Sequence, residues 1–467
     1  MKSRNITILA LALLALSSCG SVKKWSDSLY GKYERPDSIT TQGIVRDPVN
    51  DNAILEGNND FGNLPWREVF TDPQLQTLIA KALENNTNLQ NAILNVDMAE
   101  AQLSSAKLSF LPTVAFTPEG TLTHFGTHSE TVKSYTLPIV ARWNIDLWGN
   151  IKAQKRAAQA ALLQSQDYQT AVKTQLICNV ANLYYTLLSL DRQMEIVSDM
   201  QNLTKDTWDM MKLQMEYGSA RSTSVQSAEA AYYSVLTQSN TLKQSIREAE
   251  NSLSLLLGEP AHAIARGKLE DQKLPSSFSG GVDASILDNR PDVHANEMAL
   301  ASCLYGIESA RSQFYPQLTI TGTGGWSNNN GMVNPGKLLL NAVGSLVQPI
   351  FQQGKLRAQL RVSKDQYQQA LNTWQQSVLA AGSEVSNALV SYNTADANDK
   401  LERQQIEVLK KNVEQTQMLY KQSSSTYLEV ITAEQNLLNA QISQVQDQFS
   451  KMQSVVNLYY ALGGGRN

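Results

Sequence analysis

The seven residues AKLSFLP at 106–112 return as ARSQFYP at 310–316. Both versions contain Ala, a cation, an aromatic residue and a closing Pro. The duplication continues further along the chain: from residue 149 to residue 258, adding 205 to a residue number repeatedly gives the same residue type, without a gap. The matched pairs include Gly149 with Gly354, Val180 with Val385, Asn182 with Asn387, Glu229 with Glu434 and Gly258 with Gly463. A constant offset over this range predicts two copies of one long structural unit, because a loop insertion would have changed it.

Each copy is predicted to contain the same elements in the same order. A helical stretch should stop at Pro112 or Pro316, because Pro disfavours helix in the residue before it. A segment of about 37 residues with strand-like alternation follows. A helical stretch rich in Ala, Gln, Ser and Leu then starts at Gly149 or Gly354. In the first copy it spans about 65 residues, which makes a helix of roughly 100 Å.

A second long helix follows a break near 217–222 in the first copy and near 422–427 in the second. Its apolar residues follow alternating steps of three and four, which predicts a coiled-coil seam. In the first copy the seam consists of Val225, Ala228, Tyr232, Val235, Ser239, Leu242, Ile246, Ala249, Leu253 and Leu256. In the second copy the most regular seam lies elsewhere on the helix, at Leu428, Ile431, Gln435, Leu438, Ile442, Val445, Phe449, Met452, Val456 and Tyr459. We therefore expect equivalent helices to bury different faces, as they would with different neighbours in a ring.

The segments between Pro and Gly are predicted to form four strands. In 134–147 the residues at odd positions are all apolar from Tyr135 to Leu147, whereas Thr136, Arg142 and Asn144 lie on the other face. A period of two with one apolar face is typical of a half-buried strand. The fourth segment, 338–351, is less regular because it begins with three consecutive Leu residues. Strands of this length are long enough to cross an outer membrane at a tilt, and a small soluble sheet packed on the helices is the alternative.

Four strands in lipid cannot remain an open sheet, because unpaired backbone groups in hydrocarbon cost several kcal/mol each. Closure would then need further chains. Two chains would give a barrel of eight strands, which side chains usually fill, whereas three would give twelve strands and leave a lumen. Aromatic residues near the strand ends fit interface girdles: Trp143, Trp148, Trp326 and Phe351.

The N-terminus is predicted to be an export signal. Lys2 and Arg4 precede an apolar run that ends in Leu16, Ser17, Ser18 and Cys19. This run is too short to span a bilayer. Its end resembles the bacterial lipobox, in which the Cys is lipidated and becomes the first residue of the mature protein, and an ordinary signal with an incidental Cys is the alternative. Acyl chains on Cys19 would anchor the N-terminus to a membrane leaflet. By the same resemblance Gly20, in place of an Asp, favours forwarding to the outer membrane.

Together these features divide the chain into six segments. They are a lipoprotein signal peptide (1–18), a lipidated N-terminal segment (19–71), a first repeat (72–258, strands at about 113–147), a linker or equatorial segment (259–288), a second repeat (289–463, strands at about 317–351) and a C-terminal tail (464–467).

Several function classes are disfavoured by the sequence. A formal charge of −4 without a long basic run gives no footprint for nucleic acid. The four His residues are scattered and no nucleophile elbow or phosphate loop is present, so we expect no enzyme, no cofactor and no metal site. Cys178 and Cys303 are expected to be inert buried thiols, with a disulfide between them as the alternative. No later segment approaches 18 unbroken apolar residues, which argues against a transmembrane helix.

Several motifs together point to a known family: the lipobox, the two phrases AKLSFLP and ARSQFYP, the run DLWGNIKA at 146–153 answered by PIFQQGKLRA at 349–358, and RPD at 290–292. In this order they resemble the outer-membrane efflux proteins of the TolC and OprM type, in their lipoprotein branch. The resemblance covers nearly the whole chain after residue 60. It implies a mainly α homotrimer in which each chain gives four strands to a 12-stranded β-barrel in the outer membrane and its long helices to a periplasmic α-barrel. It also implies two partners, a periplasmic adaptor and an inner-membrane pump.

In that family the turns between paired helices form a periplasmic tip, where acidic residues narrow the tunnel into a gate. The matching stretch here is YKQSSSTYLEVITA at 420–433, with Glu429 and Thr432 at the acidic positions and Ser423 where Gly is usual. In the first copy Gly218 is retained, but the acidic positions hold Ser224 and Ser227. Three copies of Glu429 would form a ring that attracts cations. The alternative is that Glu429 only complements a helix N-terminus.

The sequence therefore predicts a passive trimeric exit duct for drugs or other small molecules, in the outer membrane, with no enzymatic activity. A lipid-anchored coiled-coil spacer or adhesin without channel activity is the alternative.

Overall fold

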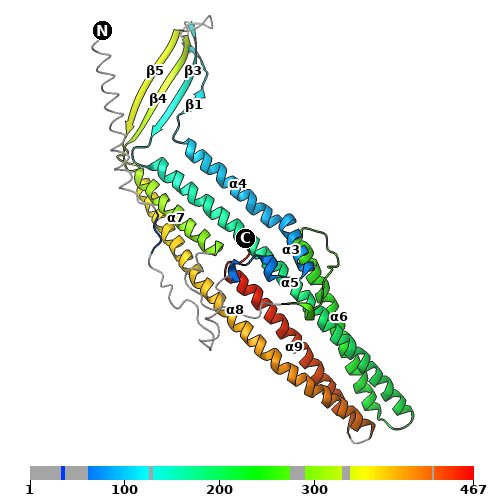
Figure 1. The fold of residues 1–467 in the computed structure, drawn as a ribbon. Helices are drawn as coiled ribbons and strands as arrows, with labels where there is room; N and C mark the ends of the chain where they lie inside the picture. The colour runs from blue at the N-terminus through cyan, green and yellow to red at the C-terminus, as the bar shows by residue number, and fades with distance from the viewer. Residues whose placement is uncertain are drawn as a thin grey trace. The chain divides into compact units, whose positions relative to one another are not determined.

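The structure is a computed structural model that describes residues 33–36, 61–125, 130–273, 290–328, 337–422 and 425–466. It is mainly helical, as predicted, with the strands gathered in one sheet (Figure 1). The helices are α2 (Trp66–Val69), α3 (Pro73–Asn85), α4 (Thr87–Leu108), α5 (Asn150–Glu216), α6 (Ser222–Leu256), α7 (Pro291–Ser312), α8 (Lys355–Lys421) and α9 (Tyr427–Ala461), with short 3-10 turns η1 (Phe61–Asn63) and η2 (Leu269–Asp271). The strands are β1 (Thr113–Phe116), β2 (Glu119–Phe125), β3 (Glu130–Ile145), β4 (Gln317–Asn328) and β5 (Lys337–Val347).

The two copies match in element length. Helices α4 and α7 both have 22 residues, α5 and α8 both have 67, and α6 and α9 both have 35. The breaks between the paired long helices fall after Glu216 and after Lys421, where the sequence predicts them. Helices α4 and α7 end earlier than predicted, four residues before Pro112 and Pro316 respectively. Short turns occupy the residues between each helix end and its proline.

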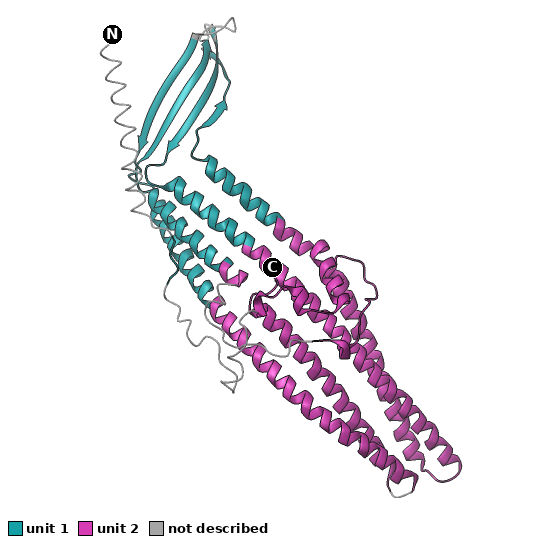
Figure 2. Ribbon diagram, viewed as in Figure 1, with its two compact units in different colours: residues 1–39, 94–166, 295–376 teal, residues 40–93, 167–294, 377–467 magenta. Residues whose placement is uncertain are grey.

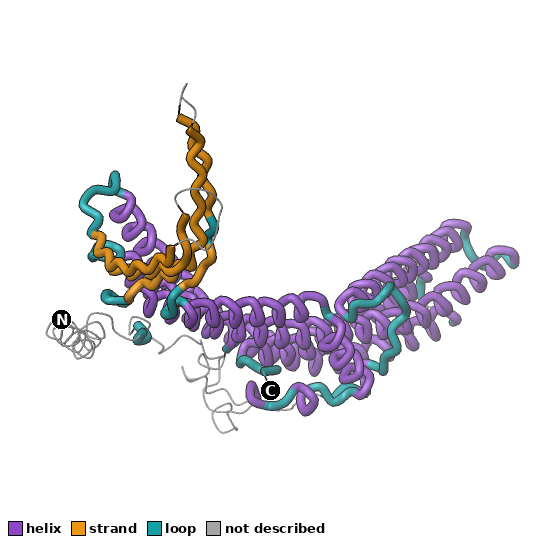
Figure 3. Tube along the Cα trace, turned by 90° about the horizontal axis from the view of Figure 1, so that it is seen from above, coloured by secondary structure: helices purple, strands orange, loops and turns teal. Residues whose placement is uncertain are grey.

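The chain divides into two compact units (Figure 2). Unit 1 comprises residues 1–39, 94–166 and 295–376 and contains the whole sheet. Unit 2 comprises residues 40–93, 167–294 and 377–467 and contains α3, α6 and α9. Colouring by secondary structure shows the strands together in one place, and the remaining described chain as helices joined by loops (Figure 3).

The sheet of unit 1 is antiparallel, with β3 and β4 in the centre. Strands β1 and β2 pair with β3 in one continuous register, from Thr113 opposite Arg142 to Phe125 opposite Glu130. The single strand predicted here is interrupted because Pro118 and Pro138 cannot donate backbone hydrogen bonds to the ladder. The remaining pairs are β3 with β4 and β4 with β5.

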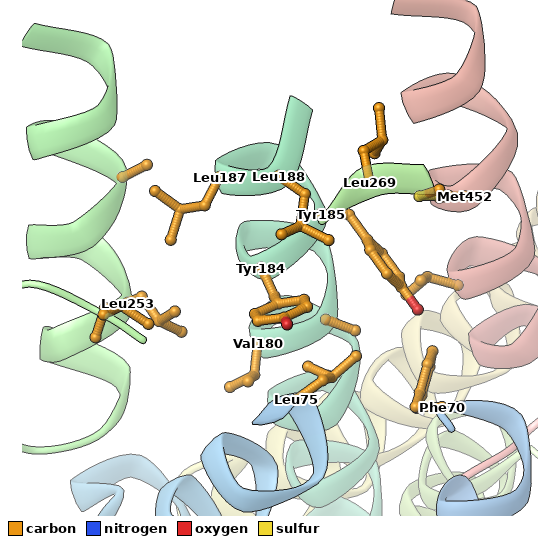
Figure 4. Packing of buried hydrophobic residues seen from close by; sticks show 14 of the residues in the cluster. Phe70, Leu75, Val180, Tyr184, Tyr185, Leu187, Leu188, Leu253, Leu269 and Met452 are labelled. Atoms are coloured by element: carbon orange, nitrogen blue, oxygen red, sulfur yellow. The ribbon is translucent and has the colours of Figure 1, made fainter. Parts of the chain in front are cut away.

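The main apolar core lies in unit 2, where α3, α5, α6 and α9 meet (Figure 4). Its fully buried side chains include Leu75, Tyr184, Leu253 and Tyr459. The Tyr184 hydroxyl donates to Asp72 Oδ2 at 2.6 Å. Asp72 also caps α3, since its Oδ1 accepts from the backbone N–H of Gln74 at 2.8 Å. This single carboxylate therefore fixes the start of α3 on α5.

Helix α6 largely buries the predicted seam, including Val225, Ala228, Val235, Leu242 and Leu253. The prediction that α9 buries a different face is wrong near its start. There Leu428 is 70% exposed, and the buried residues are Val430 and Ala433, which are equivalent to Val225 and Ala228. Farther along, α9 buries predicted seam positions as well as Leu458 and Ala461, which lie outside the seam. Periodicity alone failed because one helix packs against neighbours on two sides.

Candidate functional site

One face of the sheet in unit 1 is apolar across its full width. Directly opposite residues share a face in an antiparallel sheet, and the register aligns Phe116, Ile139, Gly324 and Leu340 in one row. Many apolar side chains of this face are exposed in the chain: Val114, Phe116, Leu122, Ile139, Trp143, Ile320, Trp326, Leu338, Leu340 and Leu346. We call this set the apolar sheet face. A patch of this breadth is typical of a surface that is covered by lipid or by protein.

The opposite face of the sheet is more polar. A representative row joins Thr113, Arg142, Thr321 and Val343. The Thr319 hydroxyl donates to Asn144 Oδ1 across the β3–β4 pair at 3.0 Å. The register also settles the irregular fourth segment, because it places Leu338 and Leu340 on the apolar sheet face and Leu339 on the other face.

Both outer edges of the sheet are open within the part of the chain that the structure describes. Strands β1 and β2 pair only with β3 there, and β5 pairs only with β4. An open edge presents unpaired N–H and C=O groups to any strand that approaches. The sheet therefore combines a broad exposed apolar face with two edges that can accept further strands.

Glycines mark the passage from sheet to long helix in both copies. Gly149 directly precedes α5 with φ of 75°, and Gly354 directly precedes α8 with φ of 79°. Both angles lie in the left-handed region that favours glycine. At the first junction the Asp146 carboxylate accepts backbone hydrogen bonds from Ile151 and Lys152 at 3.1 and 2.9 Å, which caps α5.

The tryptophans near the strand ends make specific contacts in unit 1. Trp148 stacks on Tyr315, with ring centroids 4.9 Å apart, and its indole N–H donates to the Pro316 carbonyl at 2.6 Å. Trp143 donates to the Phe110 carbonyl at 2.9 Å. The two repeated phrases thus lie at the base of the sheet, each bound by a tryptophan of the first copy.

The helix tip of unit 2 contains the predicted gate residues. Gly218 has φ of 72° in the turn after α5, and Ser423 lies outside the described residues. Ser224 is half-buried, and the Ser227 and Thr432 hydroxyls donate to carbonyls one turn back in their own helices, at 2.9 and 2.8 Å. Glu429 is exposed, and its Oε2 accepts from the Thr426 backbone N–H at 3.2 Å. Glu429 therefore caps α9, which leaves its charge near the tip surface.

A contact that sequence reasoning missed joins the two helix pairs at this tip. The Tyr420 hydroxyl of α8 donates to Gln214 Oε1 of α5 at 2.6 Å. Beside it, Met211, Val225, Ala228, Tyr427 and Val430 form a small buried cluster. The repeat gives no signal for this pair, because the position equivalent to Gln214 is Leu419.

Arg290, the first residue of the RPD stretch, is a buried cation of unit 2. It is 2% exposed and donates to Asp292 at 3.0 and 2.7 Å, to Glu384 at 2.6 Å and to the Ala461 carbonyl at 3.3 Å. These acceptors raise the pKa of the guanidinium above its ordinary value against the opposing effect of burial. The side chain thus joins the start of α7, the middle of α8 and the end of α9.

Other predicted features have the following outcomes. Cys178 and Cys303 are free thiols; Cys178 is buried, but Cys303 is only half-buried, so the expected burial is wrong for the second. In the ranges covered by the structure, no three His, Cys, Asp or Glu side chains are arranged to hold a metal ion. None of the described helices combines the length and apolar character needed to cross a membrane. Cys19 lies outside the described residues.

A polar groove of about 1160 Å³ opens in unit 2 between α5, η2, α8 and α9. Its lining carries both signs of charge, for example Arg192, Glu270, Asp396 and Lys451. These groups pair with one another: Arg192 with Glu270 at 2.9 Å, and Lys451 with Asp396. The groove therefore has no excess of one charge that would select an ionic ligand.

A profile described as "Outer membrane efflux protein" matches residues 78–259 and 284–464, which is most of the chain and covers both copies. The chain belongs to the outer membrane efflux protein family. This membership confirms the resemblance and the predicted location in the outer membrane, and the family consists of transport proteins.

Family members with curated names match over nearly their whole length. The cation efflux system protein CusC of Escherichia coli K12 is 26% identical over 462 residues, which is 97% of each chain. The probable outer membrane lipoprotein SilC of Salmonella typhimurium is 25% identical over 449 residues, 94% of this chain and 95% of SilC. The pyoverdine export outer membrane protein OpmQ of Pseudomonas aeruginosa is 26% identical over 479 residues, 100% and 98% of the two chains.

Solved structures of the family share the fold. The open state of the MtrE outer membrane channel of Neisseria gonorrhoeae has a TM-score of 0.79 and 26% identity, covering 93% of this chain and 98% of MtrE. A crystal structure of CusC has a TM-score of 0.81 and 24% identity, covering 93% and 99%.

Proposed function

We propose that the protein is the outer-membrane exit duct of a tripartite efflux pump and that it works as a homotrimer. The observation that carries this proposal is the sheet, which has a broad apolar face and two open edges. A soluble spacer or adhesin would leave both features exposed to water. With β1 and β2 counted as one interrupted strand, three copies of the sheet give a closed barrel of twelve strands with lipid outside and a lumen inside.

The remaining features fit the same assembly. The long helices of each chain extend the conduit as an α-barrel in the periplasm, and the tip is the place where an adaptor and an inner-membrane pump engage. Lipidation of Cys19 anchors each N-terminus to the outer membrane. Relatives carry names for cation, pyoverdine and toluene efflux, so the duct itself is expected to accept chemically different substrates delivered by its pump.

The proposal is tested by reconstitution of the purified full chain in planar bilayers. We expect stable single-channel currents from a species whose mass after chemical cross-linking equals three chains. A cross-linked mass of one or two chains, or a trimer without conductance, would contradict the duct. Protease applied to intact liposomes should leave the sheet uncut, whereas a spacer anchored only by its lipid would be cut in residues 113–147.

Glu429 is proposed to form a ring of three carboxylates at the tip of the trimer. Glu429→Gln removes the charge but retains an oxygen that can accept the Thr426 hydrogen bond, so the cap of α9 should persist. We expect cation selectivity in bilayers to fall by about twofold or more, because like charges around a narrow opening attract counter-ions. Glu407→Gln, an exposed carboxylate farther up α8, is the matched control. Equal selectivity of the wild type and the Glu429 variant would remove this residue from the gate.

A further inference from the structure

The last strand of the sheet leads into α8 through a strongly exposed apolar pair. Ile350 and Phe351, which lie in the junction between β5 and α8, are 96% and 82% exposed. The side-chain amide of Gln348 donates to the Phe314 carbonyl at 3.0 Å, which ties this junction to the second repeated phrase. The pair therefore lies at the base of the sheet, and it follows Leu346 of the apolar sheet face by only a few residues in the chain.

The first turns of α8 carry four exposed cations directly after this pair: Lys355, Arg357, Arg361 and Lys364. Within the residues of unit 1 that the structure describes, Arg361 pairs only with the exposed Asp365, at 4.0 Å, and the other three make no ion pair. Arg357, Arg361 and Lys364 follow steps of four and three, so they share one face of the helix. We call the apolar pair and these four cations the junction patch.

The stability of α8 does not explain the cations of the junction patch. The N-terminus of a helix carries a partial positive charge, which disfavours cations beside it. The first turn of α8 contains no acidic residue that would offset Lys355 and Arg357. An anionic partner would compensate both the cations and the helix start.

The first copy of the repeat lacks this combination. The position equivalent to Phe351 is Asp146, whose carboxylate caps α5. The position equivalent to Arg361 is Arg156, which pairs with the Glu308 carboxylate at 3.9 Å. Its side chain is 21% exposed, against 86% for Arg361. Acidic groups of the chain thus compensate the junction into α5, whereas the junction into α8 is left positively charged.

Continuity with the apolar sheet face favours lipid over a protein as the partner. The exposed apolar residues of β5, including Leu340 and Leu346, lead along the chain to Ile350 and Phe351 before the cations begin. A chain that leaves hydrocarbon for headgroups and then water meets its surroundings in this order. Basic residues directly beside a membrane-embedded segment attract anionic lipid.

We propose that the junction patch binds anionic phospholipid headgroups of the membrane leaflet at the base of the sheet. This inference rests on the proposed function, because it needs the sheet to cross the outer membrane. Ile350 and Phe351 enter the boundary between acyl chains and headgroups, and the cations reach the phosphates with extended side chains. The rise from Arg357 to Arg361 is about 6 Å, which fits within a headgroup layer of about 5–8 Å on each side of the bilayer.

Photoactivatable lipids test the proposal on the purified full chain in phosphatidylcholine liposomes. One sample contains photoactivatable phosphatidylglycerol and the other contains photoactivatable phosphatidylcholine at the same mole fraction, and mass spectrometry maps the labelled peptides. Phosphatidylglycerol should label the segment 350–364 about threefold more strongly, because the cations attract its net negative headgroup. The equivalent segment 145–159 should show no such preference. Equal labelling of 350–364 by both lipids would overturn the proposal.

Variants show whether the cations cause the preference. Arg357→Gln combined with Arg361→Gln removes two exposed charges and should abolish the preference of 350–364 for phosphatidylglycerol. Lys410→Gln combined with Lys411→Gln removes two exposed charges of the same helix in unit 2 and should leave it unchanged. A wild-type preference in the first variant would refute the assignment.

Salt provides a second measurement on the unmodified protein, which is decisive even if the arginine variant fails to fold. Raising the salt concentration from about 0.1 M to about 1 M shortens the screening length from about 10 Å to about 3 Å. The preference for phosphatidylglycerol should then disappear. A preference that persists at high salt would contradict binding through charge.

Labelling of the sheet separates this proposal from the exit duct. If both lipids label β5 around Leu340 but neither labels 350–364, the sheet contacts lipid and the junction patch is covered by protein, such as a second copy of the chain. That result would overturn the present proposal alone. If neither the sheet nor the junction patch is labelled, the proposed function fails as well.

Discussion

Arg290→Met should lower the free energy of unfolding of unit 2 by about 2–3 kcal/mol, because breaking a buried ion pair leaves its partners uncompensated. The side chain is 2% exposed and serves two carboxylates and one carbonyl. We place the effect below the usual range for buried pairs because Asp292 and Glu384 keep 35% and 45% side-chain exposure and can be hydrated after the change. The measurement is the midpoint of thermal unfolding, followed by circular dichroism of the purified protein.

Two further variants show whether the loss comes from the carboxylates. Arg361→Met removes an arginine whose ion pair with Asp365 is highly exposed, so it should change the midpoint little. Combining Arg290→Met with Glu384→Gln should recover part of the loss, because one uncompensated charge is gone. A midpoint shift no larger than that of Arg361→Met would show that Arg290 does not hold α7, α8 and α9 together.

Leu340→Arg should impair membrane insertion, because Leu340 is 76% exposed on the apolar sheet face. An arginine on the lipid side of an outer-membrane strand costs about 2–4 kcal/mol near the bilayer midplane. The proposed trimer would carry three such residues. The measurement is the fraction of protein that resists urea extraction from outer membranes and shows heat-modifiable migration on gels.

Asn341→Arg is the matched control for this prediction. Asn341 is the next residue in β5, and it lies on the opposite face of the sheet, across from Thr323. The Asn341→Arg variant should insert into the membrane like the wild type, because that face of the sheet lines the proposed lumen. Equal insertion of both arginine variants would mean that the apolar sheet face does not contact lipid.

The repeat made much of this fold predictable from the sequence. The constant offset of 205 predicts that the long helices have equal lengths in the two copies. The positive φ angles of Gly149 and Gly354 explain why glycine appears at both junctions between sheet and helix. Strand positions were also predictable, because a period of two with one apolar face is a local pattern. The break between β1 and β2 falls at Thr117 and Pro118, and the register places Pro138 of β3 opposite Thr117. Pro118 is visible in the sequence, but its place beside Pro138 is known only once the register is known.

Contacts between the copies were not predictable in this way. The bond between Tyr420 and Gln214 joins residues that do not correspond in the repeat, so comparison of the copies gives no hint of it. The burial at the start of α9 depends on which helices lie beside it, and periodicity reports only one face.

The equal lengths of α5 and α8 limit how this gene can change. One inserted residue in α8 would advance everything beyond it by about 1.5 Å and turn it by about 100°. Tyr420 would then point away from Gln214, and the turn after α8 would no longer be level with the turn after α5. We therefore expect insertions and deletions in these helices to be tolerated only when both copies acquire the same change, or when whole helical turns are replaced by others of equal length.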